Sequence, residues 1–188
     1  MTASTAKTPL TDRGKNMLRV TDYSNHRGGV ITLLPQIHSM YKENALADKS
    51  GVLQNPGHII TWQQKIKKRL TDINWRFLIA TQKDKLVGVL FFRYNGTNAF
   101  IEEFQFHKNF EGDTYAFDQI FKKLEMDKKS QSAVFYVSQF VKLDKNKEIL
   151  ASAGFKEVSG DEYELLGNLN EARASLRLRF FAGSGAIV

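Results

Sequence analysis

Cysteine is absent from all 188 residues, which excludes disulfides, thiolate metal ligands and a cysteine nucleophile. Histidine is scarce: His26, His38, His58 and His107 form no close pair with metal-ligand spacing, so we expect no metal site. No apolar run is long enough to cross a membrane, and the polar N-terminus lacks the apolar core of a signal peptide. We therefore expect a cytoplasmic protein with no membrane contact.

The residues that are present are typical of one folded domain. Hydrophobic residues make up 42% of the chain and charged residues 25%, and the length suffices to bury a core. We interpret residues 1–16 as a flexible N-terminal arm and 17–188 as a single domain. The 27 Lys and Arg against 20 Asp and Glu give a net charge of +7, which permits a polyanionic partner but does not require one.

The first half of the domain predicts one strand and two helices. Residues 17–24 alternate apolar and polar side chains, whereas 30–44 and 58–70 have apolar side chains at helical spacing. Pro35 should limit or kink the first helix. The basic run "KIKKR" (65–69) is expected to be a solvated helix face, and an RNA contact is the weaker alternative.

The middle of the chain predicts three successive antiparallel strands at 75–82, 86–94 and 99–106. Asn95-Gly96 is a hairpin signal, because both central positions of a type I′ turn need positive φ. A helix follows, with apolar side chains recurring through 117–124.

The rest of the chain predicts a strand within 132–140 and a short helix over 145–155 that ends at Gly154. Strand-like segments follow at 155–158 and 163–166, and the alternation of "ASLRLRFF" (174–181) predicts a last strand. The resulting order, β-α-α-β-β-β-α-β-α-β-β, is an α+β fold with a mixed, mostly antiparallel central sheet flanked by helices.

This order resembles the GNAT superfamily of acetyl-CoA-dependent N-acyltransferases, as a divergent member. "FLIATQKDKLVGVLFF", with its Val87-Gly88 pair, looks like the second and third strands of the family. "AFIEEFQFHKNFEGDTYAFDQIF" looks like its fourth strand, cofactor loop and third helix, and "ILASAGFKEV", with Gly154-Phe155, like the end of its fourth helix. The segment 174–181 falls where the family has its last strand. The resemblance implies transfer of an acetyl or other acyl group from acetyl-CoA to a primary amine on a small molecule or a protein.

The resemblance also implies a coenzyme A site at the start of the helix after the fourth strand, where backbone N–H groups can bind pyrophosphate. Glu111, or Lys108 if the loop shifts, falls on the basic position of the family motif, and Thr114 and Ala116 fall on its glycines. Asp113 adds a negative charge there; alternatively, it is a helix cap and the loop is only a helix start. The implied cofactor-binding residues are Phe104, Phe106, Lys108, Gly112, Asp113, Thr114, Tyr115, Ala116 and Asn146.

Amide formation from a thioester needs a polarised carbonyl, a neutral amine and a stabilised thiolate. By resemblance, backbone N–H groups at the end of the fourth strand serve the first need. Glu103 is the candidate base, although both Glu103 and Glu102 can equally be ordinary strand-face charges.

The proton donor is the weakest part of the match. The family tyrosine falls on Leu150, which cannot donate a proton, and Tyr115, Tyr136 and His107 are the alternatives. The acidic loop and Leu150 favour the alternative function, a GNAT-fold binding or regulatory protein without catalysis. Most proteins with this fold are enzymes, however, so the N-acetyltransferase is the preferred expectation. A homodimer formed through the C-terminal strands is a further expectation.

Overall fold

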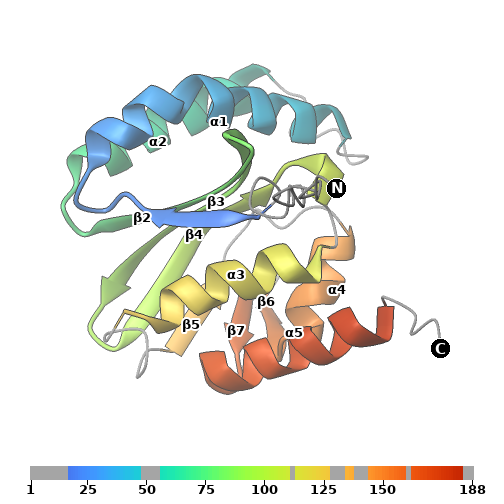
Figure 1. Ribbon diagram of the computed structural model, residues 1–188. Coiled ribbons are helices and arrows are strands. Elements are labelled where there is room, and N and C mark those ends of the chain that lie inside the picture. Colours follow the sequence, from blue (N-terminus) through green and yellow to red (C-terminus); the bar gives the residue numbers. More distant parts are fainter. Residues whose placement is uncertain are drawn as a thin grey trace, which may run out of the picture.

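The computed structural model describes residues 17–47, 56–110, 113–127, 134–137, 144–159 and 162–183. One seven-stranded sheet forms its centre, in the order β1-β2-β3-β4-β5-β7-β6, and helices cover both faces (Figure 1). In chain order the elements are β1 (Arg19–Asp22), α1 (Arg27–Ala47), α2 (Pro56–Thr71), β2 (Trp75–Gln82), β3 (Lys85–Asn95), β4 (Asn98–Phe106), the 3₁₀ turn η3 (Lys108–Phe110), α3 (Thr114–Glu125), β5 (Val134–Val137), α4 (Asp144–Ser152), β6 (Phe155–Ser159), β7 (Glu162–Leu165) and α5 (Leu169–Gly183). The expected arm, 1–16, lies outside the described residues.

The sheet is mixed, as the sequence predicts. Within the described residues, β4 and β5 pair in parallel, and the other five strand pairs are antiparallel. Helices α1 and α2 lie together over one side of β2, β3 and β4, whereas α3 and α5 lie on the other side (Figure 1). This arrangement confirms the α+β fold class.

The β2–β3 hairpin has a type I′ turn, the geometry that the sequence predicts for the β3–β4 hairpin instead. Gln82 pairs with Lys85, and the two residues between them, Lys83 and Asp84, have φ of 50° and 59°. Positive φ at both central positions is the type I′ pattern, whose twist matches that of the strands.

The β3–β4 hairpin differs from the predicted type I′ turn at Asn95-Gly96. Asn95 still belongs to β3 and pairs with Asn98, so the central residues are Gly96 and Thr97. Only Gly96 has a positive φ (59°), which is the type II′ pattern. The hairpin is confirmed, and the predicted turn type is wrong because the turn lies one residue later.

The helix boundaries follow local signals. Helix α1 begins at Arg27 and continues through Pro35 to Ala47, so the expectation that Pro35 limits the helix is wrong. Pro56 stands at the start of α2, where its missing N–H costs no hydrogen bond. Gly154, with φ of 90°, ends the turn after α4 as predicted.

The last strand predicted at 174–181 is wrong, because this segment belongs to α5. A capping box starts the helix: the Glu171 N–H donates to Asn168 Oδ1 (3.0 Å), and the Asn168 N–H donates to Glu171 Oε2 (3.2 Å). The buried residues Leu169, Ala172 and Leu176 then recur at helical spacing. In chain order, the last strand among the described residues is β7.

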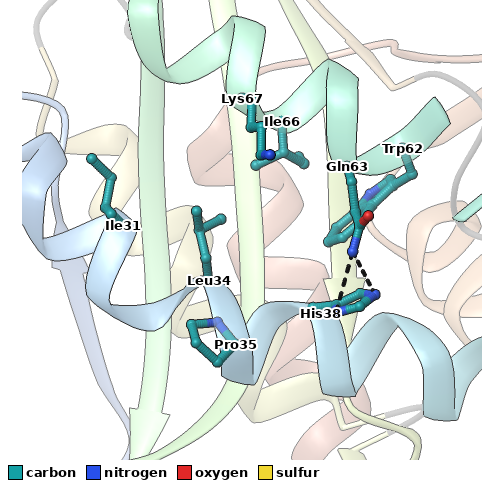
Figure 2. A pocket seen from close by; sticks show the side chains of 8 residues that line it. All are labelled: Ile31, Leu34, Pro35, His38, Trp62, Gln63, Ile66 and Lys67. Atoms are coloured by element: carbon teal, nitrogen blue, oxygen red, sulfur yellow. Dashed lines mark hydrogen bonds between the residues drawn. The ribbon is translucent and has the colours of Figure 1, made fainter. Parts of the chain in front are cut away.

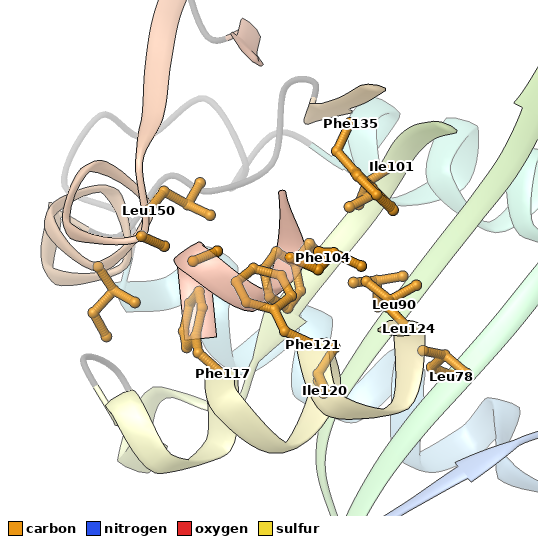
Figure 3. Packing of buried hydrophobic residues seen from close by; sticks show 14 of the residues in the cluster. Leu78, Leu90, Ile101, Phe104, Phe117, Ile120, Phe121, Leu124, Phe135 and Leu150 are labelled. Carbon is orange, nitrogen blue, oxygen red and sulfur yellow. The ribbon is translucent and has the colours of Figure 1, made fainter. Parts of the chain in front are cut away.

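Two hydrophobic clusters fill the two sides of the sheet. The cluster under α1 and α2 includes Ile37, Trp62 and Phe91. The larger cluster lies against α3, α4 and α5 and is rich in phenylalanine (Figure 3). Gly88 lets β4 pack closely here, because a Cβ at this position would lie 2.7 Å from Phe106 Cδ1.

Candidate active site

Strand β4 extends beyond its pairing with β5. The parallel ladder between them ends at Ile101 and Val137, whereas β4 continues to Phe106. A β-bulge at Glu102 separates the paired part from the extension, since Ile101 and Glu103 face consecutive residues of β3. The extension therefore has β3 on one side and no described partner strand on the other.

The backbone polar groups of Phe104 and Phe106 point to the side of β4 opposite β3. Hydrogen-bonded and non-hydrogen-bonded pairs alternate along an antiparallel ladder. The His107 N–H donates to the Val87 carbonyl oxygen (2.7 Å), so His107 and Val87 form a hydrogen-bonded pair. By the alternation, Phe106 with Gly88 and Phe104 with Leu90 are non-hydrogen-bonded pairs, in which the N–H and carbonyl groups of β4 point away from β3. Their side chains are buried in the core, with ring centroids 4.6 and 4.9 Å from that of Phe117. Phe104 and Phe106 can therefore offer a cofactor only their backbone.

Glu103 lies on the other face of β4, toward α2, and is 3% exposed. Arg69 Nη1 donates to Glu103 Oε2 at 3.0 Å, and the Gln105 side-chain amide donates to Oε1. Arg69 Nη2 lies 3.4 Å from Glu102 Oε2, and the guanidinium stacks 4.7 Å above the Trp75 ring. The candidate base is therefore part of a buried ion-pair network.

Burial and charge act in opposite directions on Glu103. Burial, the largest influence, raises the pKa of its carboxyl group, whereas the Arg69 guanidinium, the Trp62 indole N–H and the Gln105 amide lower that pKa. The Trp62 N–H acts by proximity, because it is buried without a hydrogen-bond partner in the described part of the chain. A raised pKa suits a general base, but a structural ion pair can show the same shift.

Asn44 joins this network from α1. Its Nδ2 donates to the Phe106 carbonyl oxygen at 2.8 Å and to Gln105 Oε1 at 3.3 Å. Its own Oδ1 is buried and finds no partner among the described residues, like the Trp62 indole N–H. One unsatisfied acceptor and one unsatisfied donor in the same network mark a place where water or a polar ligand group can bind.

Glu43 of α1 binds the two basic residues that follow β4. Its Oε2 lies 3.1 Å from His107 Nε2 and 3.3 Å from Lys108 Nζ. The hydrogen bond from Lys108 is the main cause that lowers the pKa of Glu43, and His107 also lowers it. Lys108, a candidate for the basic loop position, is thus held toward α1.

Asp113 caps the start of α3. Its Oδ1 accepts hydrogen bonds from the N–H groups of Tyr115 (2.9 Å) and Ala116 (3.1 Å), and its backbone is extended, as at an N-cap. A pyrophosphate is expected to bind these same N–H groups, so the Asp113 carboxylate occupies the place of the pyrophosphate. Thr114 begins the helix, and Glu111 and Gly112 lie outside the described residues.

The described residues place no proton donor for a thiolate at the expected position. Leu150 is fully buried in the cluster against α3 (Figure 3). Asn146 is on α4 and Tyr136 on β5, but their side chains lie outside the described part of the structure. Tyr115 is at the exposed start of α3, and His107 contacts Glu43, so the identity of a donor stays a prediction.

Sequence reasoning missed Arg69, Asn44 and Gln105. The sequence predicts that Arg69 belongs to a solvated basic face, yet the residue is 8% exposed. The signal was present, because Arg69 follows Trp62 and Ile66 on the apolar stripe of α2. An arginine on such a stripe implies a buried acidic partner.

Two further findings limit the kinds of site in the described residues. They contain no group of three or more His, Cys, Asp or Glu side chains that could hold a metal ion. Nor does any of their helices have the length and apolar character needed to span a membrane.

Several solved acetyltransferases share this fold. The PaiA N-acetyltransferase from Thermoplasma acidophilum, solved in complex with coenzyme A, gives a TM-score of 0.60 at 12% identity, over 79% of this chain and 96% of its own. An acetyltransferase from Thermus thermophilus gives 0.55 at 13% identity, over 80% and 97%. A chimera of the spermidine N-acetyltransferase SpeG from Vibrio cholerae and hSSAT gives 0.52 at 18% identity, over 80% and 93%.

Neither a protein-family model nor a curated protein matches the sequence. At these identities the similarity establishes the fold, which is that of the GNAT N-acetyltransferases, as in a GNAT-family protein from Desulfovibrio desulfuricans (TM-score 0.55, 7% identity, over 79% of this chain and 96% of its own). Fold alone does not establish activity, so the function has to be argued from the site.

Proposed function

We propose that this protein transfers an acetyl group from acetyl-CoA to a primary amine. The observation that carries the proposal is the extension of β4 past its pairing with β5, where the backbone groups of Phe104 and Phe106 face away from β3. A strand edge can bind an elongated ligand that carries amides, much as it binds a further strand, although here the Phe106 carbonyl oxygen already accepts from Asn44. The PaiA enzyme with this fold was solved in complex with coenzyme A.

The residues fit one part of acetyl-CoA better than another. Backbone N–H groups on β4 suit the pantetheine amides and can polarise a thioester carbonyl. The start of α3 suits a pyrophosphate only when the Asp113 carboxylate leaves the N–H groups of Tyr115 and Ala116. At ~5 Å, one carboxylate facing one phosphate charge costs about 0.8 kcal/mol in water and ~3 kcal/mol at an effective dielectric constant near 20. We therefore expect weaker binding than a loop without this acid would give.

The acceptor amine has to lose a proton when its nitrogen bonds to the acetyl carbon. Glu103 is the proposed base, and because it is buried we expect it to act through water rather than by direct contact. Arg69 supports this role by favouring the ionised carboxylate. Leu150 supplies no acid for the thiolate, so we expect slow turnover.

The first experiment is thermal unfolding with and without millimolar acetyl-CoA, followed by calorimetric titration. A ligand at a hundred times its Kd stabilises the folded state by about 2.7 kcal/mol, which a melting shift reveals. Acetyl transfer is then measured with a panel of small-molecule and protein amines. Spermidine belongs in the panel because the SpeG chimera is a spermidine N-acetyltransferase.

The variant Asp113→Asn tests the anion site at the start of α3 without removing the helix cap. Asparagine also caps helices, so the variant keeps the cap and removes the charge. It is expected to bind acetyl-CoA about four-fold tighter or more. Asp84→Asn, an exposed change in the β2–β3 turn, is the matched control and should bind like the wild type. Absence of a melting shift and of heat in both the wild type and Asp113→Asn would refute acetyl-CoA binding.

A second candidate is a GNAT-fold binding or regulatory protein without catalysis. Its support is the Asp113 carboxylate, which occupies the α3 N–H groups in place of an external anion. This candidate predicts no response to acetyl-CoA in either variant, and a protein partner would then be sought. An RNA contact through the exposed Lys65, Lys67 and Lys68 of α2 is weaker and would show as binding that falls steeply with salt.

Two expectations stay predictions. The cytoplasmic location rests on the sequence alone. The sequence predicts a homodimer through the C-terminal strands; 174–181 is helical and cannot supply such a strand, but β6 lies at an edge of the sheet. Light scattering that shows only monomer would remove the dimer.

A further inference from the structure

A pocket of about 420 Å³ lies between α1 and α2, and no β4 residue lines it (Figure 2). Its walls are mainly apolar and include Leu34 from α1 and Trp62 and Ile66 from α2. Small-molecule sites are commonly apolar hollows of this size with a few placed polar groups. The polar groups of this pocket therefore indicate what it can bind.

Pro35 helps to form the α1 wall. Pro35 and Ile31 both line the pocket, and Pro35 has no N–H to bond the Ile31 carbonyl one turn earlier. The lining residues of α1 are spaced as one helical stripe, next to the stripe of Val30, Ile37 and Tyr41 that is buried in the core. The pocket is thus a groove between the helices rather than part of the core.

A histidine and a glutamine face each other across the pocket. The Gln63 side-chain nitrogen lies 2.8 Å from His38 Nε2 (Figure 2). Burial, and to a lesser extent the charge of Lys42, lowers the pKa of His38 and so favours its neutral ring. This pair offers polarity without charge.

Lys67 supplies the charge of the pocket. Its side chain reaches from α2 toward the gap between the helices (Figure 2). No acidic side chain of the described residues pairs with it, and the α2 sequence contains no Asp or Glu. An apolar hollow with one uncompensated cation at its wall complements an anion that has an apolar body.

We propose that this pocket binds an amphiphilic monocarboxylate, with its alkyl or aryl part against Leu34 and Trp62 and its carboxylate at Lys67. An amine of the same shape would place a second cation beside Lys67, and an alcohol would leave Lys67 uncompensated. The proposal goes beyond acetyl transfer and does not depend on it, because no lining residue lies on β4 or at the start of α3; Trp62 lines the pocket and also lies near Glu103.

The test is titration of the full chain with octanoate, measured by calorimetry and by tryptophan fluorescence, since Trp62 lines the pocket. Octanol and octylamine are the matched probes. Octanoate should saturate one site with a change in emission, octanol should bind about five-fold more weakly, and octylamine should not bind. No saturation by octanoate at millimolar concentration, or equal binding of octylamine, overturns the proposal.

Two variants test the location of the site. Lys67→Gln should weaken octanoate binding about five-fold or more, whereas Lys65→Gln, exposed on the same helix but outside the pocket, should leave it unchanged. Ile31→Trp should block the pocket without overpacking the core, because Ile31 is 55% exposed. Equal weakening by the two lysine variants, or wild-type affinity in a folded Ile31→Trp protein, contradicts the proposed site.

Discussion

Arg69 shows how much depends on single side chains in this protein. It reaches Glu103 and Glu102 from α2 and stacks on Trp75, although its neighbours Lys67 and Lys68 are exposed. Two charges buried together are tolerated because each compensates the other. Removing one of them leaves the other without compensation in the interior.

We predict that Arg69→Met lowers the free energy of unfolding by about 3–5 kcal/mol, because it leaves the Glu103 carboxylate buried without a cation. The double variant Arg69→Met/Glu103→Gln should recover most of the loss. Without Arg69 the folded-state pKa of Glu103 rises further, so the deficit should shrink as pH falls toward the unfolded value. Urea unfolding at a neutral and at an acidic pH measures both effects.

Arg93→Met is the matched control for this prediction. Arg93 also contacts Glu102, but its side chain is 42% exposed, so its removal should cost less than about 1 kcal/mol. A loss in Arg69→Met no larger than that in Arg93→Met would show that the buried pair does not hold α2 to β4.

Asp113 gives a second prediction at this scale. Asp113→Ala removes the acceptor for the Tyr115 and Ala116 N–H groups and should lower the free energy of unfolding by about 1 kcal/mol. Asp113→Asn should be nearly neutral, because asparagine caps equally well. Chemical denaturation of the two variants distinguishes them, and an equal loss in both would mean that the negative charge, rather than the cap, stabilises α3.

At the scale of elements, α5 is where alternation of side chains misled the sequence interpretation. "LRLRFF" alternates like a strand, but the Asn168–Glu171 capping box begins a helix just before it. Arg173 of this helix contacts Asp118 (3.1 Å) and Glu125 of α3, and the two helices pack against each other. Helix α5 therefore covers one face of α3.

We predict that Ala174→Val lowers the free energy of unfolding by about 0.5 kcal/mol, because valine has a lower helix propensity than alanine and position 174 is exposed. Ala174→Gly should lower it by about 1 kcal/mol. In a strand valine would instead stabilise relative to alanine. Thermal unfolding that finds Ala174→Val more stable than the wild type would contradict the helix.

At the scale of the whole molecule, ionisable groups on the α1 and α2 side of the sheet have opposite effects on stability. The pKa of His38 and that of Glu43 are lowered on folding, so each contributes stability at high pH that is lost as pH falls through its folded-state pKa. Glu103 has a raised pKa and contributes stability at low pH that is lost as pH rises. Stability should therefore depend on pH in separable steps.

We predict that the free energy of unfolding decreases as pH falls below 6.5, the unfolded value for His38, because the unfolded chain takes up a proton more readily than the folded one. His38→Gln removes this step and should flatten the profile near that pH. His26→Gln, at a histidine outside the pocket, is the control and should leave the step in place. Urea unfolding at a series of pH values checks the prediction, and the same step in His38→Gln as in the wild type would contradict it.

The sequence by itself determined the strands β2, β3 and β4, the Gly154 turn and the resemblance that Val87-Gly88 and Gly154-Phe155 carry, because these depend on periodicity and turn chemistry within a few residues. It also contained the capping box of α5, whose helical signal was outweighed by alternation. Tertiary structure decided that Arg69 meets Glu103, that Asn44 reaches the end of β4 and that α1 and α2 leave a pocket at Lys67. These outcomes depend on which residues distant in sequence are brought together by packing, and single-residue patterns do not encode that pairing.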